Sequence, residues 1–413
     1  MIDFALLMPW LEFAVRWLHV ITAIAWIGSS FYFIALDLGL REAPGQPAGV
    51  KGEEWQVHGG GFYHIRKFTV APERMPEDLT WFKWESYATW LSGFALLVLM
   101  YYVGAELYLV DPTVRDLPVW AAVAISLGSL ALGWLLYDLI CRSPLGADNT
   151  RLMVLLFVIL VAMSWGYAQV FSGRAALLHL GAFTATIMSA NVFLVIIPNQ
   201  KIVVADLKAG RTPDAKYGVV AKQRSTHNNY LTLPVIFLML SNHYPLAFAS
   251  AWNWAIASLV FLMGVTIRHY FNTLHARRGA PNWTWAATAA LFAAIMALSL
   301  APLIRAEPEE IAWDAPVPAA FARYAEAEGF DEVHGIVAGR CSMCHAAEPG
   351  WPGIAVAPKG VRLETAADTA RHARDIFLQS GVTHAMPPGN LSWMEPEERA
   401  AIVRWYRAAQ SES

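Results

Sequence analysis

The feature that most constrains the fold is a series of apolar stretches, each long enough to cross a lipid bilayer. A transmembrane helix needs about 20 mostly apolar residues. The chain contains such stretches at residues 11–36, 86–104, 118–138, 152–172, 175–197, 230–249, 252–270 and 283–304. Only 15% of the residues are charged, compared with about 25% in soluble domains. The sequence therefore predicts an all-α fold, in which residues 1–304 form an eight-helix polytopic membrane bundle.

The orientation of this bundle follows from its basic residues. Lys and Arg are concentrated in loops 37–86 and 198–229 and in connections 138–151 and 268–282, whereas the alternate connections carry only Arg115 and Arg174. Basic connections face the cytoplasm, so both termini are predicted to be periplasmic in a protein of the inner membrane. The net charge of −3 gives no indication of a nucleic-acid partner, and the sequence does not reveal an oligomeric state.

A Pro- and acid-rich linker, 305–318, leads to a polar segment at 319–413 that carries the most specific motif. Cys341-Ser342-Met343-Cys344-His345 is typical of c-type haem attachment, because two thiols add to the two porphyrin vinyl groups and the adjacent histidine reaches the iron. A zinc-binding or redox CxxC is the alternative, but zinc needs further ligands and the segment has no other Cys. We predict a small, class I-like cytochrome c domain with one covalent haem c.

The second iron ligand of such a domain is expected to be Met or His. Met386 is the preferred candidate because the two prolines that follow it restrict the backbone; Met394, Met343 and His372 are the alternatives. The segment is predicted to run as helix, haem loop, helix, Met loop and helix. Covalent haem is attached outside the cytoplasm in such cytochromes, which agrees with the orientation inferred from charge.

Ionisable residues inside membrane spans are costly and mark functional sites. In the first apolar stretch, Glu12, Arg16 and His19 share one helix face, and His179 and His243 are predicted at similar depth in the outer half of the bilayer. One interpretation is a b-type haem held by two of these histidines, with Arg16 beside a propionate. The other is that each histidine bonds a neighbouring helix or faces interfacial water. The sequence leaves both open.

A second polar group is predicted at the cytoplasmic face. Loop 37–86 is too long for a simple connector, and its glycines permit close backbone approach to a ligand. The aromatic and polar residues on this side are Tyr63, His64, Arg66, Trp81, Trp84, His227, Asn228, Asn229 and Arg268. An ordinary structured loop with a basic, aromatic belt is the alternative interpretation.

The stretches His58–His64, Trp81–Gly93, Gly181–Lys201 and His227–Tyr244 together resemble those of bacterial membrane-bound urate oxidases with a C-terminal cytochrome c. The resemblance covers essentially the whole chain. It implies oxidation of urate to 5-hydroxyisourate in purine catabolism. It also implies that electrons pass through the haem c to the respiratory chain, by way of a cytochrome c or a terminal oxidase, rather than to oxygen.

Urate is a planar monoanion, so its site needs a cation, stacking rings and amide groups, and its oxidation needs a base. Guanidinium suits the anion and histidine suits the base. The cytoplasmic candidates are His64 and His227 as bases, Arg66 and Arg268 as cations, Tyr63, Trp81 and Trp84 for stacking, and Asn228 and Asn229 for the edges. A site near His19, His179 and His243 would shorten the route to haem c, and the sequence does not decide between the two faces.

Two other functions remain open at this point. A respiratory subunit could pass electrons from quinol to a cytochrome without any purine chemistry, although a pure relay has no need of the long aromatic loop 37–86. A transporter with an accessory cytochrome is the third interpretation.

Overall fold

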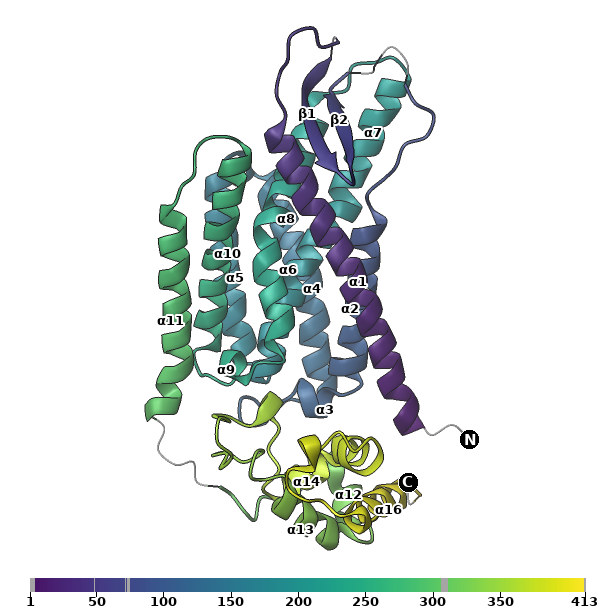
Figure 1. The fold of residues 1–413 in the computed structure, drawn as a ribbon, viewed down its shortest axis with the longest axis vertical. Coiled ribbons are helices and arrows are strands. Elements are labelled where there is room, and N and C mark those ends of the chain that lie inside the picture. Colours follow the sequence, from purple (N-terminus) through teal and green to yellow (C-terminus); the bar gives the residue numbers. More distant parts are fainter. Residues whose placement is uncertain (1–3, 48, 71, 73–74, 306–310, 412–413) are drawn as a thin grey trace.

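The computed structural model of the chain describes all residues except 1–3, 48, 71, 73–74, 306–310 and 412–413. Figure 1 shows a bundle of long helices with a β-hairpin at one end and a small helical domain at the other. The bundle consists of α1 (Phe4–Gly39), α2 (Trp84–Leu97), α3 (Ala105–Tyr108), α4 (Val119–Arg142), α5 (Asn149–Ala168), α6 (Gly173–Ala190), α7 (Ile197–Lys208), α8 (Ala215–Ser241), α9 (Pro245–Phe248), α10 (Asn253–His275) and α11 (Trp283–Arg305). One π-helical turn, Val98–Tyr102, extends α2, and another, Asn191–Ile196, joins α6 to α7.

Six helices among the described residues are long and apolar enough to cross a membrane, which supports a membrane protein. The two predicted spans outside this set are 86–104 and 230–249. The first forms α2 and its π-helical turn, and the second spans the end of α8 and α9. Each packs inside the bundle, α2 against α1 and α8 against α6 and α10. The arrangement of eight spans therefore stays a prediction.

The core of the bundle is centred on α6. Leu177, Leu180, Phe183 and Ile187 are almost fully buried, and their spacing of three to four residues places them on one helix face. Helix α4 approaches so closely that a Cβ at Gly133 would lie 2.0 Å from the Phe183 ring. Small residues allow such close helix contacts in membranes. This burial and close packing place α6 at the centre of the bundle.

The loop between α1 and α2 contains the only strands in the described part of the chain, so the prediction of an all-α fold is wrong here. β1 (Val50–His58) pairs with β2 (Gly61–Phe68) in an antiparallel hairpin. Gly59 and Gly60 form its two-residue turn with positive φ angles of 60° and 80°. Glycine adopts these angles without strain, which is why Gly-Gly is typical of tight hairpin turns.

The C-terminal domain has its own core and follows the predicted order of elements. Its helices are α12 (Ala322–Glu326), α13 (Phe330–Arg340), α14 (Ala366–Arg371), α15 (Ala373–Ile376) and α16 (Pro396–Ser411). Val333 and Val337 of α13 pack with Ile402 and Trp405 of α16, all four nearly inaccessible to solvent. The CxxCH motif follows α13, and Met386 lies in the loop before α16.

This domain lies under the bundle, near α3 and α9 (Figure 1). The Tyr108 hydroxyl donates to Asp375 Oδ2 over 3.4 Å. Arg374 Nη1 lies 3.7 Å from Glu12 Oε1. These polar contacts join α3 and α1 of the bundle to α15 of the domain.

Candidate functional site

The histidine of the CxxCH motif is held in place by a hydrogen bond to the backbone. His345 Nδ1 donates to the backbone oxygen of Val361 over 2.9 Å, so the proton sits on Nδ1 and Nε2 keeps its lone pair. Ligand histidines are generally oriented by such a bond from the second ring nitrogen. Cys341 and Cys344 are free thiols, and the two positions flank the same loop as His345. The side chains present therefore fit a covalently attached porphyrin.

The loop that carries Met386 is held by Arg399 of α16. Arg399 Nη1 donates to the backbone oxygens of Met386, at 2.9 Å, and Ser380, at 2.6 Å. Met386 is half-buried, whereas the alternative Met394 is buried in the core of the domain. Met343 is 38% exposed. The placement favours Met386, and its role as the second iron ligand stays a prediction.

The hairpin holds three of the predicted urate-site residues. His64 Nε2 lies 2.8 Å from Glu53 Oε2, and Arg66 Nε donates to the same oxygen over 3.1 Å. The hydrogen bond from His64 lowers the pKa of Glu53. Tyr63 is 54% exposed. These polar contacts group His64 and Arg66 with Glu53 and not with His227.

The two predicted tryptophans after the hairpin have different surroundings. Trp81 packs against the buried aliphatic residues Val192, Ile196 and Ile197, while Trp84 is 65% exposed. The structure therefore does not bring them together as one stacking surface.

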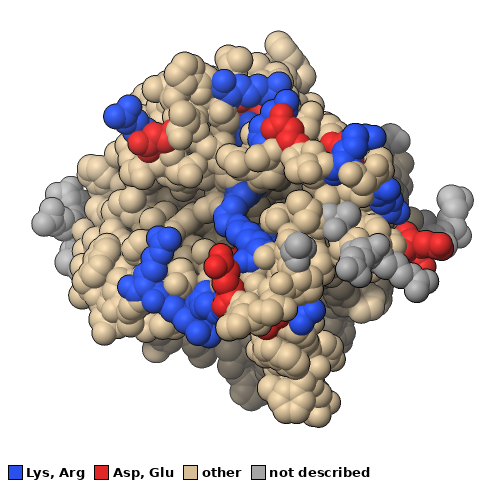
Figure 2. Space-filling model, turned by 90° about the horizontal axis from the view of Figure 1, so that it is seen from above, with Lys and Arg blue, Asp and Glu red and all other residues tan. Residues whose placement is uncertain are grey.

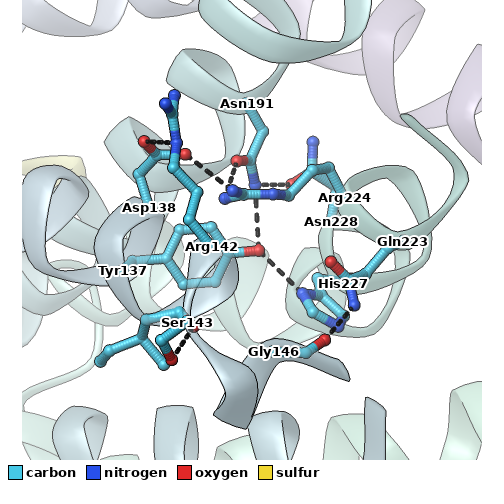
Figure 3. Close-up of polar contacts among 11 residues, drawn as sticks. Tyr137, Asp138, Arg142, Ser143, Gly146, Asn191, Gln223, Arg224, His227 and Asn228 are labelled. Carbon is cyan, nitrogen blue, oxygen red and sulfur yellow. Dashed lines mark hydrogen bonds and ion pairs between the residues drawn. The ribbon is translucent and has the colours of Figure 1, made fainter. Parts of the chain in front are cut away.

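His227 and Asn228 belong to a buried polar network between α4, the π-helical turn Asn191–Ile196 and α8 (Figure 3). The Tyr137 hydroxyl lies 2.8 Å from His227 Nδ1. Asn191 Nδ2 contacts both the Tyr137 hydroxyl, at 3.3 Å, and Asn228 Oδ1, at 3.1 Å. Arg224 Nη1 donates to Asn191 Oδ1 over 3.1 Å. A continuous chain of contacts thus joins His227 to Arg224.

Arg224 ends this chain in a buried ion pair. Its Nη2 donates to Asp138 Oδ1 over 2.7 Å, and the side chain of Arg224 is only 2% exposed. Arg142, which is 69% exposed, pairs with the other carboxylate oxygen of Asp138. Four residues of this network, Tyr137, Asp138, Asn191 and Arg224, were not among the predicted site residues. The sequence feature that could have indicated this network is Asp138, a carboxylate at the end of the predicted span 118–138.

Asn229 and Arg268 form a separate group. Arg268 Nε donates to Asn229 Oδ1 over 3.2 Å, and its Nη2 donates to Asn272 Oδ1 over 2.9 Å. The guanidinium lies over the Phe31 ring, 4.1 Å from its centroid. Asn228 and Asn229, which are successive residues of α8, therefore belong to two different polar clusters, and neither cluster contains Arg66.

A cavity of about 230 Å³ lies between α1, α2, α6 and α8. Arg16, His19 and His243 line it, as the proposed membrane site requires, but His179 does not. His179 Nδ1 contacts the Ala175 carbonyl over 2.8 Å, and its ring packs against the Tyr101 ring. Of the possible haem b pairs, His19 and His179 are therefore not placed in one cavity, whereas His19 and His243 are. A wider groove along α4 is lined mainly by apolar side chains.

Comparison with known proteins gives one match. The family model described as urate oxidase N-terminal matches residues 5–299, which include the bundle and the hairpin. No curated protein and no solved structure matches the chain. Within the described residues, no group of three or more His, Cys, Asp or Glu side chains could hold a metal ion; a c-type haem iron needs only two protein ligands.

Proposed function

Because the chain belongs to the urate oxidase N-terminal family, we propose that it oxidises urate to 5-hydroxyisourate at a membrane and passes the electrons to its own C-terminal haem c. Urate and one water give 5-hydroxyisourate, two electrons and two protons. A haem iron accepts one electron at a time, so each urate requires two transfers through the domain. The observation that supports haem c as the acceptor is the CxxCH motif, in which the His345 ring is oriented by a hydrogen bond. The domain that carries this motif packs against the bundle that the family model matches.

The chain's own residues account for how the domain would hold its cofactor. Cys341 and Cys344 would form the thioethers, and His345 and Met386 would bind the iron. The bond to Val361 keeps the His345 ring in one orientation, and Arg399 fixes the Met386 loop. When bound, the haem supplies a one-electron acceptor. A respiratory cytochrome c or a terminal oxidase would then remove the electron.

The proposed orientation places the hairpin in the cytoplasm and both termini in the periplasm of a bacterial inner membrane. Figure 2 shows Lys and Arg side chains spread over the hairpin end of the molecule. Lys67 and Lys222 lie there, both paired with Asp37. Basic residues on the cytoplasmic side are the usual arrangement, which supports this orientation.

We expect urate to reduce the haem c of the purified full-length protein in the absence of oxygen and quinol. The measurement is the visible absorbance of reduced c-type haem during anaerobic titration with urate. Two haems should be reduced per urate consumed, because urate loses two electrons. Reduction by quinol alone, with no response to urate, would instead identify a respiratory relay subunit.

The ion pair between Arg374 and Glu12 gives a second prediction, on docking of the domain. Arg374→Glu places two carboxylates together, and we expect the urate-dependent rate of haem c reduction to fall several-fold, because an exposed ion pair contributes about 0.2–1 kcal/mol. Stopped-flow absorbance measures this rate. The charge-swapped double variant, Arg374→Glu with Glu12→Arg, should recover it. Failure of the swap to recover a lowered rate would contradict a direct pairing.

A further inference from the structure

We propose that the cavity lined by Arg16, His19, Ser189 and Asn242 is the binding site for a planar, anionic, purine-sized substrate. This assignment rests on the proposed function. It places the substrate inside the bundle, beside the C-terminal domain, rather than at the hairpin.

The first argument is the charge of Arg16. Its Nη2 contacts the Met100 sulfur at 3.6 Å, and a thioether is a weak acceptor. Among the described residues, no carboxylate lies within ion-pair distance of this guanidinium, because the nearby Glu12 pairs with Arg374. A cation in a membrane-spanning helix is costly unless it is paired. An anionic ligand in the cavity supplies the missing partner, and a guanidinium binds the edge of a planar anion in a bidentate manner.

The second argument is a set of buried polar atoms on the cavity wall that lack partners in the described structure. These atoms are Ser189 Oγ and Asn242 Oδ1. Their residues are 1% and 8% exposed, respectively. A buried polar group without a hydrogen bond is destabilising, so such groups are normally satisfied. The alternating donors and acceptors around a purine ring would satisfy them.

The third argument is that a base, from α1, and a stacking surface, from α2, both line the cavity. His19 Nδ1 contacts the Thr89 carbonyl over 3.0 Å, so Nδ1 carries the proton and Nε2 is the basic nitrogen. Trp90 is held by a bond from its Nε1 to Thr186 Oγ1, at 3.2 Å. A positioned histidine accepts protons in enzymes, and an indole face stacks on flat rings.

The size of the cavity favours a small ligand. About 230 Å³ lies just below the range of roughly 300–1,000 Å³ typical of pockets for drug-sized molecules. A two-ring purine suits this volume better than a porphyrin with its four pyrrole rings. A b-type haem between His19 and His243 is therefore the less favoured occupant.

The position of the cavity also suits electron delivery to the C-terminal domain. Glu12, which the domain contacts through Arg374, is one helical turn from Arg16. By contrast, Gly39 at the hairpin end of α1 is 27 residues beyond Glu12 (39 − 12), or roughly 40 Å at 1.5 Å per residue. Electron transfer slows steeply with distance, so a hairpin site would be poorly placed.

An aromatic bridge leads from the cavity to the domain. The Tyr101 ring lies 6.3 Å from the Tyr108 ring, and the Tyr108 hydroxyl bonds Asp375. The substrate side and the domain side are therefore joined by two packed tyrosines.

The experiment measures binding of radiolabelled urate to the purified full-length protein by equilibrium dialysis, alongside anaerobic haem c reduction. Arg16→Gln should raise the Kd by about 10- to 100-fold, because a hydrogen bond to a charged group is lost. Ser189→Ala, a smaller change less prone to disturb folding, should raise it several-fold. Arg115→Gln is the matched control, because Arg115 is an exposed arginine outside the cavity. Dithionite should reduce haem c normally in all three variants.

Three outcomes would overturn the assignment. Unchanged urate binding in both Arg16→Gln and Ser189→Ala, with weakened binding in Arg66→Gln, would move the substrate to the hairpin. A b-type haem in the pyridine haemochrome spectrum that disappears in His19→Ala would make the cavity a haem site. A wild-type protein that neither binds urate nor is reduced by it would refute the proposed function itself. This outcome differs from a wrong site assignment, in which the wild-type protein still responds to urate.

Discussion

Replacing both attachment cysteines, Cys341→Ser and Cys344→Ser, is expected to abolish the covalent haem and with it all urate-dependent reduction in the C-terminal domain. Thioether bonds need the two thiols, and serine hydroxyls do not add to the porphyrin vinyl groups. The loss should be complete, in contrast to the partial effects expected for the cavity variants. Haem-dependent peroxidase staining of a denaturing gel measures it, because only covalently bound haem remains on the chain.

Cys141→Ser is the matched control for this prediction. Cys141 is also a free, half-buried cysteine, but it lies in α4 of the bundle, far along the chain from the motif. Staining should be unchanged in this variant. Urate binding by dialysis should persist in the double variant, since the cavity residues are untouched. Staining that survives the loss of both motif cysteines would contradict haem attachment at this motif.

The features predicted correctly from sequence are those determined by nearby residues. Membrane helices follow from local apolar composition, and the order of elements around Cys341–His345 follows from the motif and the flanking helical patterns. The hairpin was also encoded locally, in the Gly59–Gly60 turn. It was not predicted, because the long loop was interpreted as a binding segment or as an ordinary structured loop and not as a pair of strands.

The arrangement of the polar residues could not be predicted in this way. Asn228 and Asn229 are neighbours in sequence, yet one contacts Asn191 and the other contacts Arg268, because adjacent residues of a helix face different directions. His179 was predicted at a depth similar to that of His19, but it faces an aromatic cluster and not the cavity. Which residues share a site depends on the rotation and packing of each helix, which a single sequence does not specify.

Asp138→Asn is expected to lower the stability of the membrane bundle by about 3–5 kcal/mol, the usual cost of breaking a buried ion pair. The substitution leaves the almost fully buried Arg224 without its carboxylate. Asn191 then remains as a neutral acceptor, which cannot balance the charge. Thermal unfolding of the detergent-solubilised protein, followed by tryptophan fluorescence, measures the change.

Other residues of the network in Figure 3 provide a control variant and a test of whether the unpaired charge of Arg224 causes the loss of stability. Arg142→Gln removes the exposed partner of the same carboxylate and should cost less than about 1 kcal/mol, because exposed ion pairs contribute little. The double variant Asp138→Leu with Arg224→Met should recover much of the lost stability, since apolar replacements of buried pairs are often neutral. Equal destabilisation by Asp138→Asn and Arg142→Gln would contradict the argument, because it would show that the buried charge of Arg224 carries no special cost.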